Sequence, residues 1–167
     1  MPRLILPVAL LLALTAVDAR AQEPVVGAPD ADALFHSTDP KLDRNKQAAY
    51  HIEKDLLEAG HWEMADQWLT ERYIQHNPNA ASGRAGVVDY FTKVLKVAPK
   101  PIAPKLARPV VAVIAEGDYV VVITPRELQD PKDPSRKYTT SWFDMWRFSN
   151  GKADEHWDGA TKAGGPQ

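Results

Sequence analysis

The strongest constraint on the fold is a single change of sequence pattern near Arg108. Before it, apolar residues recur at helical spacing around residues 40–59, 61–71 and 83–98, with a short extended segment at 73–77. After it, residues 109–115, 119–124 and 138–148 are rich in β-branched and apolar side chains, and a last strand follows a turn at 150–151. Helices followed by an antiparallel meander predict the α+β class, with helices packed against one face of a curved sheet.

Capping residues predict where the helices begin and end. The Asp39 side chain can accept hydrogen bonds from the free amides of a helix that starts at Pro40. Gly60 suits the left-handed position that closes this helix. We expect the second helix to run from about His61 to Glu71, and residues 128–137 to form a polar loop between two strands.

Residues 1–21 have the pattern of a secretory signal peptide. Arg3 precedes an apolar run of about 14 residues, shorter than the roughly 20 that span a bilayer as a helix. Ala19-Arg20-Ala21 has the small residues of a cleavage site, so we expect a periplasmic or secreted protein without stable membrane insertion after cleavage; a retained anchor is the alternative. The expected organisation is a flexible leader at 22–38, one domain at 39–160 and a disordered tail at 161–167.

Charge and cysteine content exclude several classes of function. The 167 residues carry 20 Lys and Arg against 22 Asp and Glu, and the concentrated basic stretch from Lys96 to Arg108 is interrupted by prolines. Nucleic-acid binding needs clustered positive charge on one face, so we expect no nucleic-acid partner. The absence of cysteine excludes disulfides, thiolate nucleophiles and cysteine-ligated metal sites.

Several spaced motifs resemble those of one family. They are Tyr73-Ile74-Gln75-His76-Asn77-Pro78, a helix led by Gly83, Asp144-Met145-Trp146-Arg147, and Gly151-Lys152 followed by Glu155-His156-Trp157-Asp158. Together they resemble the SnoaL-like (polyketide cyclase-like) group of the nuclear transport factor 2-like superfamily. The resemblance covers about residues 40–159.

The resemblance implies a cone-shaped α+β barrel, in which N-terminal helices pack on a strongly curved, mainly antiparallel sheet and close a pocket. It also implies a homodimer packed through the sheet. Relatives include cofactor-free cyclases, isomerases, dehydratases and epoxide hydrolases as well as non-catalytic binders, so the fold does not choose the reaction. In relatives with a cyclase role a catalytic carboxylate lies on the last strand, and Asp158 is the matching position here. Export and the small Ala153 depart from the family pattern.

The loop at Asn150-Gly151 determines which polar side chains meet. A two-residue turn would place Asp144 opposite Trp157 and turn His156 to the other face. A three-residue loop with a bulge at Gly151 would place Asp144 opposite His156. We predict the three-residue loop, because it gathers aromatic and polar side chains on one face, as in a ligand pocket.

This register defines a candidate catalytic site. We predict Asp158 as the general base or acid, oriented by His156 or His76, with Asp144 as a second carboxylate. Burial among aromatics raises a carboxyl pKa and a nearby imidazolium lowers it, which can bring an acid and a base near neutrality. The expected chemistry is aldol-type cyclisation, isomerisation, dehydration or hydration of a small apolar carbonyl or ring compound, without a cofactor. The predicted substrate-binding residues are aromatic: Tyr73, Trp142, Trp146, Tyr138, Phe91 and Trp62.

Each polar residue also has a structural interpretation. His76 could cap a turn, Asp144 and His156 could make structural hydrogen bonds, and Asp158 could simply end its strand. A second hypothesis is a small-molecule binder that uses the same pocket without turnover. A third is a metal site made of His76, His156 and Asp158, although no helical histidine spacing supports it and we predict no metal.

Overall fold

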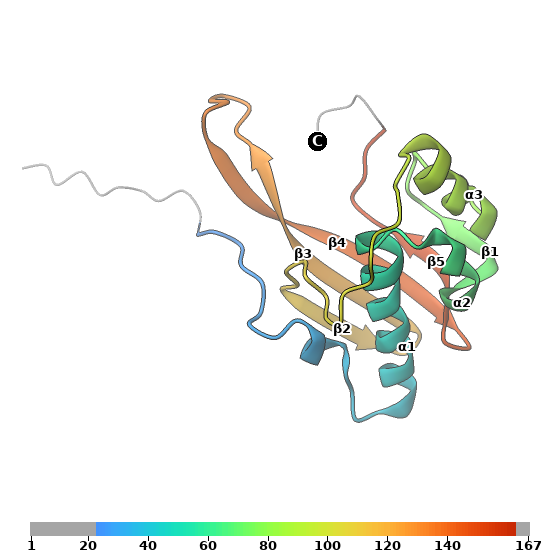
Figure 1. Cartoon of the computed structure of the whole chain (residues 1–167). Coiled ribbons are helices and arrows are strands. Elements are labelled where there is room, and N and C mark those ends of the chain that lie inside the picture. The colour runs from blue at the N-terminus through green and yellow to red at the C-terminus, as the bar shows by residue number, and fades with distance from the viewer. Residues whose placement is uncertain (1–22, 163–167) are drawn as a thin grey trace, which may run out of the picture.

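The protein has a five-stranded sheet with helices on one face. The computed structural model describes residues 23–162, so the expected signal peptide and most of the expected tail lie outside the described residues. The helices are α1 (Pro40–His51), α2 (Ala65–Trp68) and α3 (Arg84–Asp89), and the strands are β1 (Leu69–Gln75), β2 (Ala112–Glu116), β3 (Tyr119–Gln129), β4 (Lys137–Ser149) and β5 (Lys152–Trp157). The sheet order is β1-β5-β4-β3-β2 (Figure 1). β1 is parallel to β5 and the other neighbouring pairs are antiparallel, which confirms the predicted α+β class.

Helix α1 begins and ends as its capping residues predict. The Asp39 carboxylate accepts hydrogen bonds from the amides of Lys41 and Leu42, at 2.8 and 3.0 Å. The helix continues as a π-helical segment, η2 (Ile52–Glu58), and Gly60 ends it in the left-handed conformation, with φ 78°. The predicted first helix is therefore one continuous rod made of two helix types.

The second predicted helix is shorter than expected. It consists of a 3₁₀ turn, η3 (Trp62–Met64), followed by α2, and β1 already starts at Leu69, so the prediction of a helix to Glu71 is wrong. The buried residues Leu69 and Tyr73 are four positions apart, a spacing that fits a strand as well as a helix. Pairing of β1 with β5 decides in favour of the strand.

The strands of the second half run further than predicted. β3 continues through Pro125 to Gln129, so the polar loop covers only residues 130–136. β2 starts at Ala112 rather than at Pro109. β3 and β4 pair along nearly their whole length, and this cross-strand pairing extends both strands past polar residues that have little strand propensity of their own.

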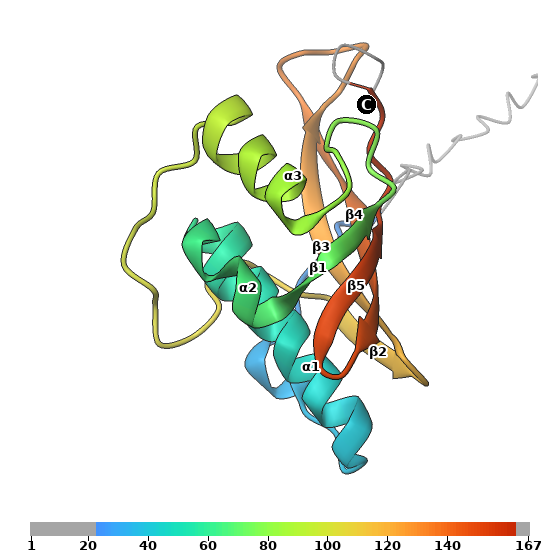
Figure 2. The ribbon, with the colours of Figure 1, turned by 90° about the vertical axis from the view of Figure 1, so that its right-hand side faces the viewer.

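The core lies between the helices and the inner face of the sheet. Figure 2 shows α1, α2 and α3 on the same side of the sheet. The buried residues on the two sides of this layer are Ala48, Ala49, Ile52 and Leu56 from the long helix, and Val113, Val120, Val122, Trp146 and Phe148 from the strands. Within residues 23–162, no helix is both long and apolar enough to cross a membrane.

Part of the expected leader packs against the domain. Phe35, on a 3₁₀ turn designated η1 (Asp32–Phe35), is completely buried in the core. The Ala28 amide donates to the Val110 carbonyl oxygen at 2.7 Å. One buried aromatic and a backbone bond thus place parts of residues 23–38 against the domain, although the segment shows no sequence period.

The turn of the last hairpin differs from the predicted one. Ser149 pairs directly with Lys152. The two residues between them, Asn150 and Gly151, are both left-handed, with φ 52° and 76°, as in the tight turns that join twisted strands. The prediction of a three-residue loop is therefore wrong.

A β-bulge in β5 then returns Asp144 and His156 to the same face of the hairpin. Asp154 is an extra residue in β5, and beyond it Trp146, rather than Asp144, lies opposite His156. Compared with the predicted pairing of Asp144 with His156, the turn and the bulge together shift the register by two residues, which is an even number. Asp144 and His156 therefore share the inner face, as predicted, although they are not direct cross-strand partners.

Candidate functional site

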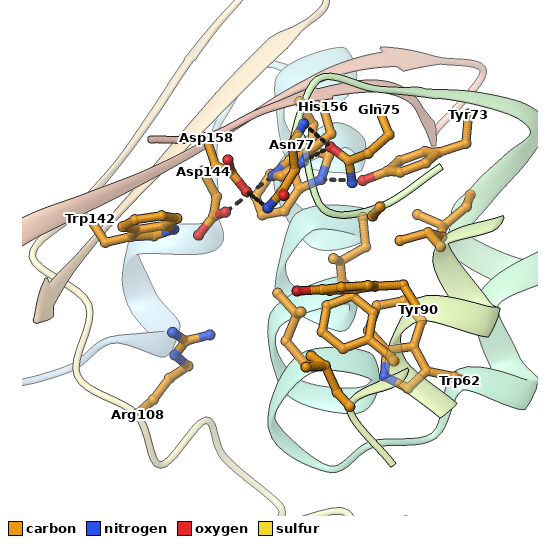
Figure 3. Close-up of a pocket in the computed structure, with 18 residues that line it drawn as sticks. Trp62, Tyr73, Gln75, Asn77, Tyr90, Arg108, Trp142, Asp144, His156 and Asp158 are labelled. Atoms are coloured by element: carbon orange, nitrogen blue, oxygen red, sulfur yellow. Dashed lines mark hydrogen bonds and ion pairs between the residues drawn. The ribbon is translucent and has the colours of Figure 1, made fainter. Parts of the chain in front are cut away.

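A cavity of about 240 Å³ lies between the inner face of the sheet and the helices (Figure 3). The sheet side is lined from β1, β4 and β5, and the helix side from η2, η3, α3 and the π-helical segment η4 (Tyr90–Val94). Most lining side chains are aromatic or aliphatic. Apart from Arg108, the polar ones that are not aromatic gather on the sheet side: Gln75, Asn77, Asp144, His156 and Asp158. An apolar cavity with a few convergent polar groups is the usual form of a small-molecule site.

A chain of hydrogen bonds runs along the sheet side of the cavity. Gln75 Oε1 accepts the Asn77 backbone amide at 3.0 Å and lies 2.8 Å from His156 Nδ1. His156 Nε2 lies 3.1 Å from Asp144 Oδ1. Because the backbone amide can only donate, it identifies the Gln75 oxygen as an acceptor, so His156 Nδ1 must carry a hydrogen. The bond between Nε2 and Asp144 needs a further proton, which the two side chains share at the wall of the cavity.

Asp158 lies beside this pair, but the residues that hydrogen-bond its carboxylate are not the predicted ones. Its Oδ2 accepts a hydrogen bond from Asn77 Nδ2 at 2.7 Å, and its Oδ1 accepts one from the Ala160 amide at 2.9 Å. Asn77, rather than His156 or His76, therefore orients the carboxylate. Each carboxylate oxygen keeps a second lone pair with which it can contact a ligand.

His76 does not lie in the cavity, so its predicted placement is wrong. Side chains alternate along an extended segment, so Gln75 and Asn77 face the cavity and His76 faces away. His76 Nε2 is bonded to Glu155 Oε1 at 2.9 Å, and the ring stacks on Trp157 with centroids 5.0 Å apart. His76 thus belongs to the outer surface, where 45% of its side chain is exposed.

The structure also changes the candidate metal ligands. With His76 on the other face, the predicted set of two histidines and one carboxylate is not brought together. Among the described residues 23–162, the side chains whose ligand atoms lie within 4.8 Å of one another are Asp144, His156 and Asp158. In this set His156 and Asp144 are hydrogen-bonded directly, so a metal ion would have to displace the proton between them.

All predicted substrate-binding residues except Tyr138 line the cavity. Trp62 and Phe91 stack with ring centroids 3.9 Å apart and form one wall. The Trp146 indole donates to the Tyr73 hydroxyl at 3.1 Å, and burial raises the pKa of Tyr73, so its hydroxyl stays neutral. Tyr138 lies toward the start of β4 and lines a neighbouring groove, which shares Trp142 and Asp158 with the cavity. Its prediction as a pocket residue is wrong, because alternation fixes the face of a strand residue but not its distance from the site.

Sequence reasoning missed a buried ion pair that reaches the cavity. Glu53 on η2 is 0% exposed, and its Oε2 accepts a hydrogen bond from Arg108 Nη1 at 2.6 Å. Burial raises the pKa of Glu53 to about 7, the Arg108 guanidinium opposes the shift, and the Asp144 carboxylate adds to it. A glutamate in a polar part of a helix normally predicts a solvated face, so the sequence carried no signal for Glu53. Alternation from Tyr73 could have identified Gln75 and Asn77.

Comparison with known proteins agrees with the fold. The family described as "SnoaL-like domain" matches residues 48–156. A candidate polyketide cyclase from Acidithiobacillus ferrooxidans is 17% identical, with a TM-score of 0.51 over 73% of this chain and 89% of that one. A candidate SnoaL-like polyketide cyclase from Jannaschia sp. CCS1 is also 17% identical, with a TM-score of 0.52 over 74% of this chain and 91% of that one. No curated protein matches the sequence. At these identities the structural likeness establishes the fold.

Proposed function

Because the chain belongs to the SnoaL-like domain family, we propose that its pocket carries out cofactor-free acid–base chemistry on a small cyclic compound with a carbonyl group. One observation carries the proposal. The Asp144–His156 pair shares a hydrogen-bonded proton at the wall of an apolar cavity, and the Asp158 carboxylate lies beside it. A proton donor and a carboxylate base within reach of one ligand are the two groups that such chemistry needs.

The proposed reaction begins with proton removal by Asp158. The proton comes from the carbon next to a ligand carbonyl, and the electron pair of the broken C–H bond becomes an enolate. In an aldol-type cyclisation this carbon forms a bond to a second carbonyl carbon of the same molecule, and the Asp144–His156 pair gives its proton to the resulting alkoxide. The proton on Asp158 then returns to the pair through solvent, which restores the site without a net change in protons. In an isomerisation no carbon–carbon bond forms, and the proton taken by Asp158 is instead returned to a different carbon of the conjugated enolate.

The cavity limits the size of the ligand. Its volume of about 240 Å³ is slightly below the roughly 300 Å³ at the lower end of the range for ligand sites. The stacked rings of Trp62 and Phe91 offer a flat apolar wall. A compound with one or two rings fits these features better than a larger polycyclic one.

A non-catalytic binding protein is the second candidate. It is favoured by the hydrogen bonds that both Asp158 oxygens already accept from Asn77 and Ala160, which give this carboxylate a structural use. A thermal-shift screen of cyclic ketones, repeated on Asp158→Asn and followed by product analysis of each hit, separates the two candidates. Hits that wild type converts and Asp158→Asn only binds support the enzyme. Hits that neither protein converts support the binder.

We further propose that two copies associate through the outer face of the sheet. Ile114, Tyr119 and Phe143 lie on this face and are 57%, 43% and 51% exposed. The helices cover the opposite face (Figure 2). Several exposed large apolar side chains on one face of a sheet are typical of a protein–protein contact.

Phe143→Lys is expected to turn the dimer into a monomer, because an ammonium group would be buried without a partner in an apolar interface. Val94 on η4 is 66% exposed and belongs to the helical side, so Val94→Lys is a matched control that should leave the dimer intact. Size-exclusion chromatography with light scattering gives the mass of each protein. A monomeric wild type, or a Phe143→Lys variant as dimeric as wild type, would contradict the proposed interface.

A further inference from the structure

Arg108 provides positive charge to the cavity. It is the one lysine or arginine among the described lining residues. Its guanidinium lies across the cavity from Asp144 and Asp158 and points toward them (Figure 3). A ligand that reaches Asp158 with one end can therefore reach Arg108 with the other.

The backbone before this arginine is held by a glutamate of the long helix. Glu58 accepts hydrogen bonds from the backbone amides of Ala107, at 3.1 Å, and Arg108, at 2.9 Å. Glu53, from the same segment η2, binds the guanidinium at 2.6 Å. Main chain and side chain of Arg108 are thus fixed separately, so the guanidinium is positioned before a ligand arrives.

The π-helical form of η2 explains how both glutamates reach the same residue. In an α-helix, residues five apart lie roughly 140° apart around the axis. A π-helix closes its turns with i→i+5 bonds, as between the Ala59 amide and the Lys54 carbonyl oxygen at 2.9 Å, and brings such residues close to one side. Glu53 and Glu58 therefore both face the segment that carries Arg108.

The guanidinium retains binding capacity. It has five N–H donors, and within residues 23–162 Glu53 is the acceptor that it contacts. Burial raises the pKa of Glu53 to about 7, so this carboxylate is a weaker counter-charge for Arg108 than a solvated glutamate would be. A planar fork of this kind matches a carboxylate better than any neutral group.

We propose that Arg108 binds a carboxylate of the ligand, so that the substrate class is a small cyclic keto acid whose ring lies along the Trp62–Phe91 wall. The carboxylate contacts Arg108 at one end of the cavity, and the carbonyl lies near Asp158 and the Asp144–His156 pair at the other. Arg108 is a binding and positioning residue in this scheme and takes no proton. Only the position of the reacting carbonyl rests on the proposed function; the carboxylate site does not.

Matched probes test the inference by binding alone. 4-Acetylbenzoate carries a ring, an enolisable ketone and a carboxylate, and methyl 4-acetylbenzoate is its neutral counterpart. Calorimetric titration of wild type is expected to show the acid binding at least about tenfold more tightly than the ester, since a charge-assisted pair contributes roughly 1.5–3 kcal/mol, or about 10- to 150-fold. Equal affinity, tighter binding of the ester, or no binding of the acid would overturn the inference.

Variants at Arg108 test whether this residue causes the preference for the acid over the ester. Arg108→Gln should bind the two probes equally, and Arg108→Lys should retain part of the preference. Because Arg108→Gln leaves the buried Glu53 without its partner, the double variant with Glu53→Gln keeps a neutral pair in place. Unchanged ester binding shows that the pocket is folded. A preference that persists without Arg108 would overturn the proposal. If wild type binds the acid and the ester equally while Asp158→Asn loses turnover, the carboxylate site is wrong and the proposed acid–base function is still supported.

Discussion

Replacing Asp158 with asparagine is expected to lower the turnover rate constant for a converted ligand by about 10²- to 10⁴-fold, the usual contribution of a positioned acid or base. The substitution removes the basic oxygen but keeps the shape of the side chain. An asparagine oxygen can still accept the Ala160 amide, so the segment after β5 should keep its path. Ligand affinity should change much less than the rate constant, because the aromatic walls are untouched.

His76→Ala is the matched control for this prediction. It removes a second polar residue that the sequence suggested for catalysis, but one that the structure places on the outer face against Glu155 and Trp157. Turnover by His76→Ala should stay within a few-fold of wild type. If Asp158→Asn is folded, binds the ligand and still turns it over at the wild-type rate, Asp158 is not the base.

Replacing Asp154 with alanine is expected to reduce the free energy of unfolding by about 2 to 4 kcal/mol, because a buried carboxylate with several donors is lost. Asp154 Oδ1 accepts from Thr70 Oγ1 at 2.8 Å and from Arg72 Nε at 2.9 Å, and Oδ2 accepts from Arg147 Nη2 at 2.7 Å. These bonds join β1, β4 and β5 at the bulge that sets the register of the site. The estimate stays moderate because the side chains of Arg72 and Arg147 remain 61% and 26% exposed and can be hydrated.

The effect of Asp154→Ala should depend on pH. The hydrogen bond from Arg72, with those from Thr70 and Arg147, holds the pKa of Asp154 well below its usual range. A carboxyl group with a depressed folded-state pKa stabilises the fold above its unfolded pKa of about 3.9 and loses this contribution as pH falls further. Urea unfolding should thus show a full difference between wild type and variant at neutral pH and a smaller one below pH about 4. Asp118→Ala removes an exposed aspartate and should show no such difference. A pH-independent difference for Asp154→Ala would contradict the role of its charge.

The faces of the last hairpin could be predicted from sequence, but not its cross-strand partners. Side chains alternate along a strand, so a shift of the pairing by two residues leaves every side chain on the same face. A shift by one residue moves each of them to the other face. The Asn150-Gly151 dipeptide favours a two-residue turn, which alone would have separated Asp144 from His156. The bulge at Asp154 restores their common face, and the Asp154 side chain accepts a hydrogen bond from Arg72, which is 82 residues away in sequence. No pattern in the sequence around Asp154 predicts a hydrogen-bond partner so far away in the chain.

The histidine before Asn77-Pro78 shows a different limit. The prediction that His76 orients Asp158 rests on the motif around Asn77-Pro78 and takes no account of the direction of the side chain. Alternation from the buried Tyr73 already predicts that Gln75 and Asn77 face the cavity and that their neighbour does not. In this case the period of the strand was a better guide to the site than the chemistry of the side chain.

The helical side of the site lay beyond sequence reasoning. Glu53 and Glu58 meet Arg108 only because the last turns of the helix are π-helical and the proline-rich connector passes over them. Neither the helix type nor the path of the connector follows from hydrophobic periodicity. The aromatic wall was predictable, since Trp62 and Phe91 fall on the apolar stripes of their segments.

Hydrogen exchange at carbon is the most direct test of the central claim that this pocket moves protons. Acetophenone and 4-acetylbenzoate in deuterated buffer, at concentrations that saturate the thermal shift, report proton removal as loss of the acetyl methyl signal in the ¹H NMR spectrum. Wild type is predicted to accelerate this loss well above the rate in buffer for at least one probe, and Asp158→Asn is predicted to remove the acceleration. Binding of both probes by wild type with exchange no faster than in Asp158→Asn would show that the pocket only binds.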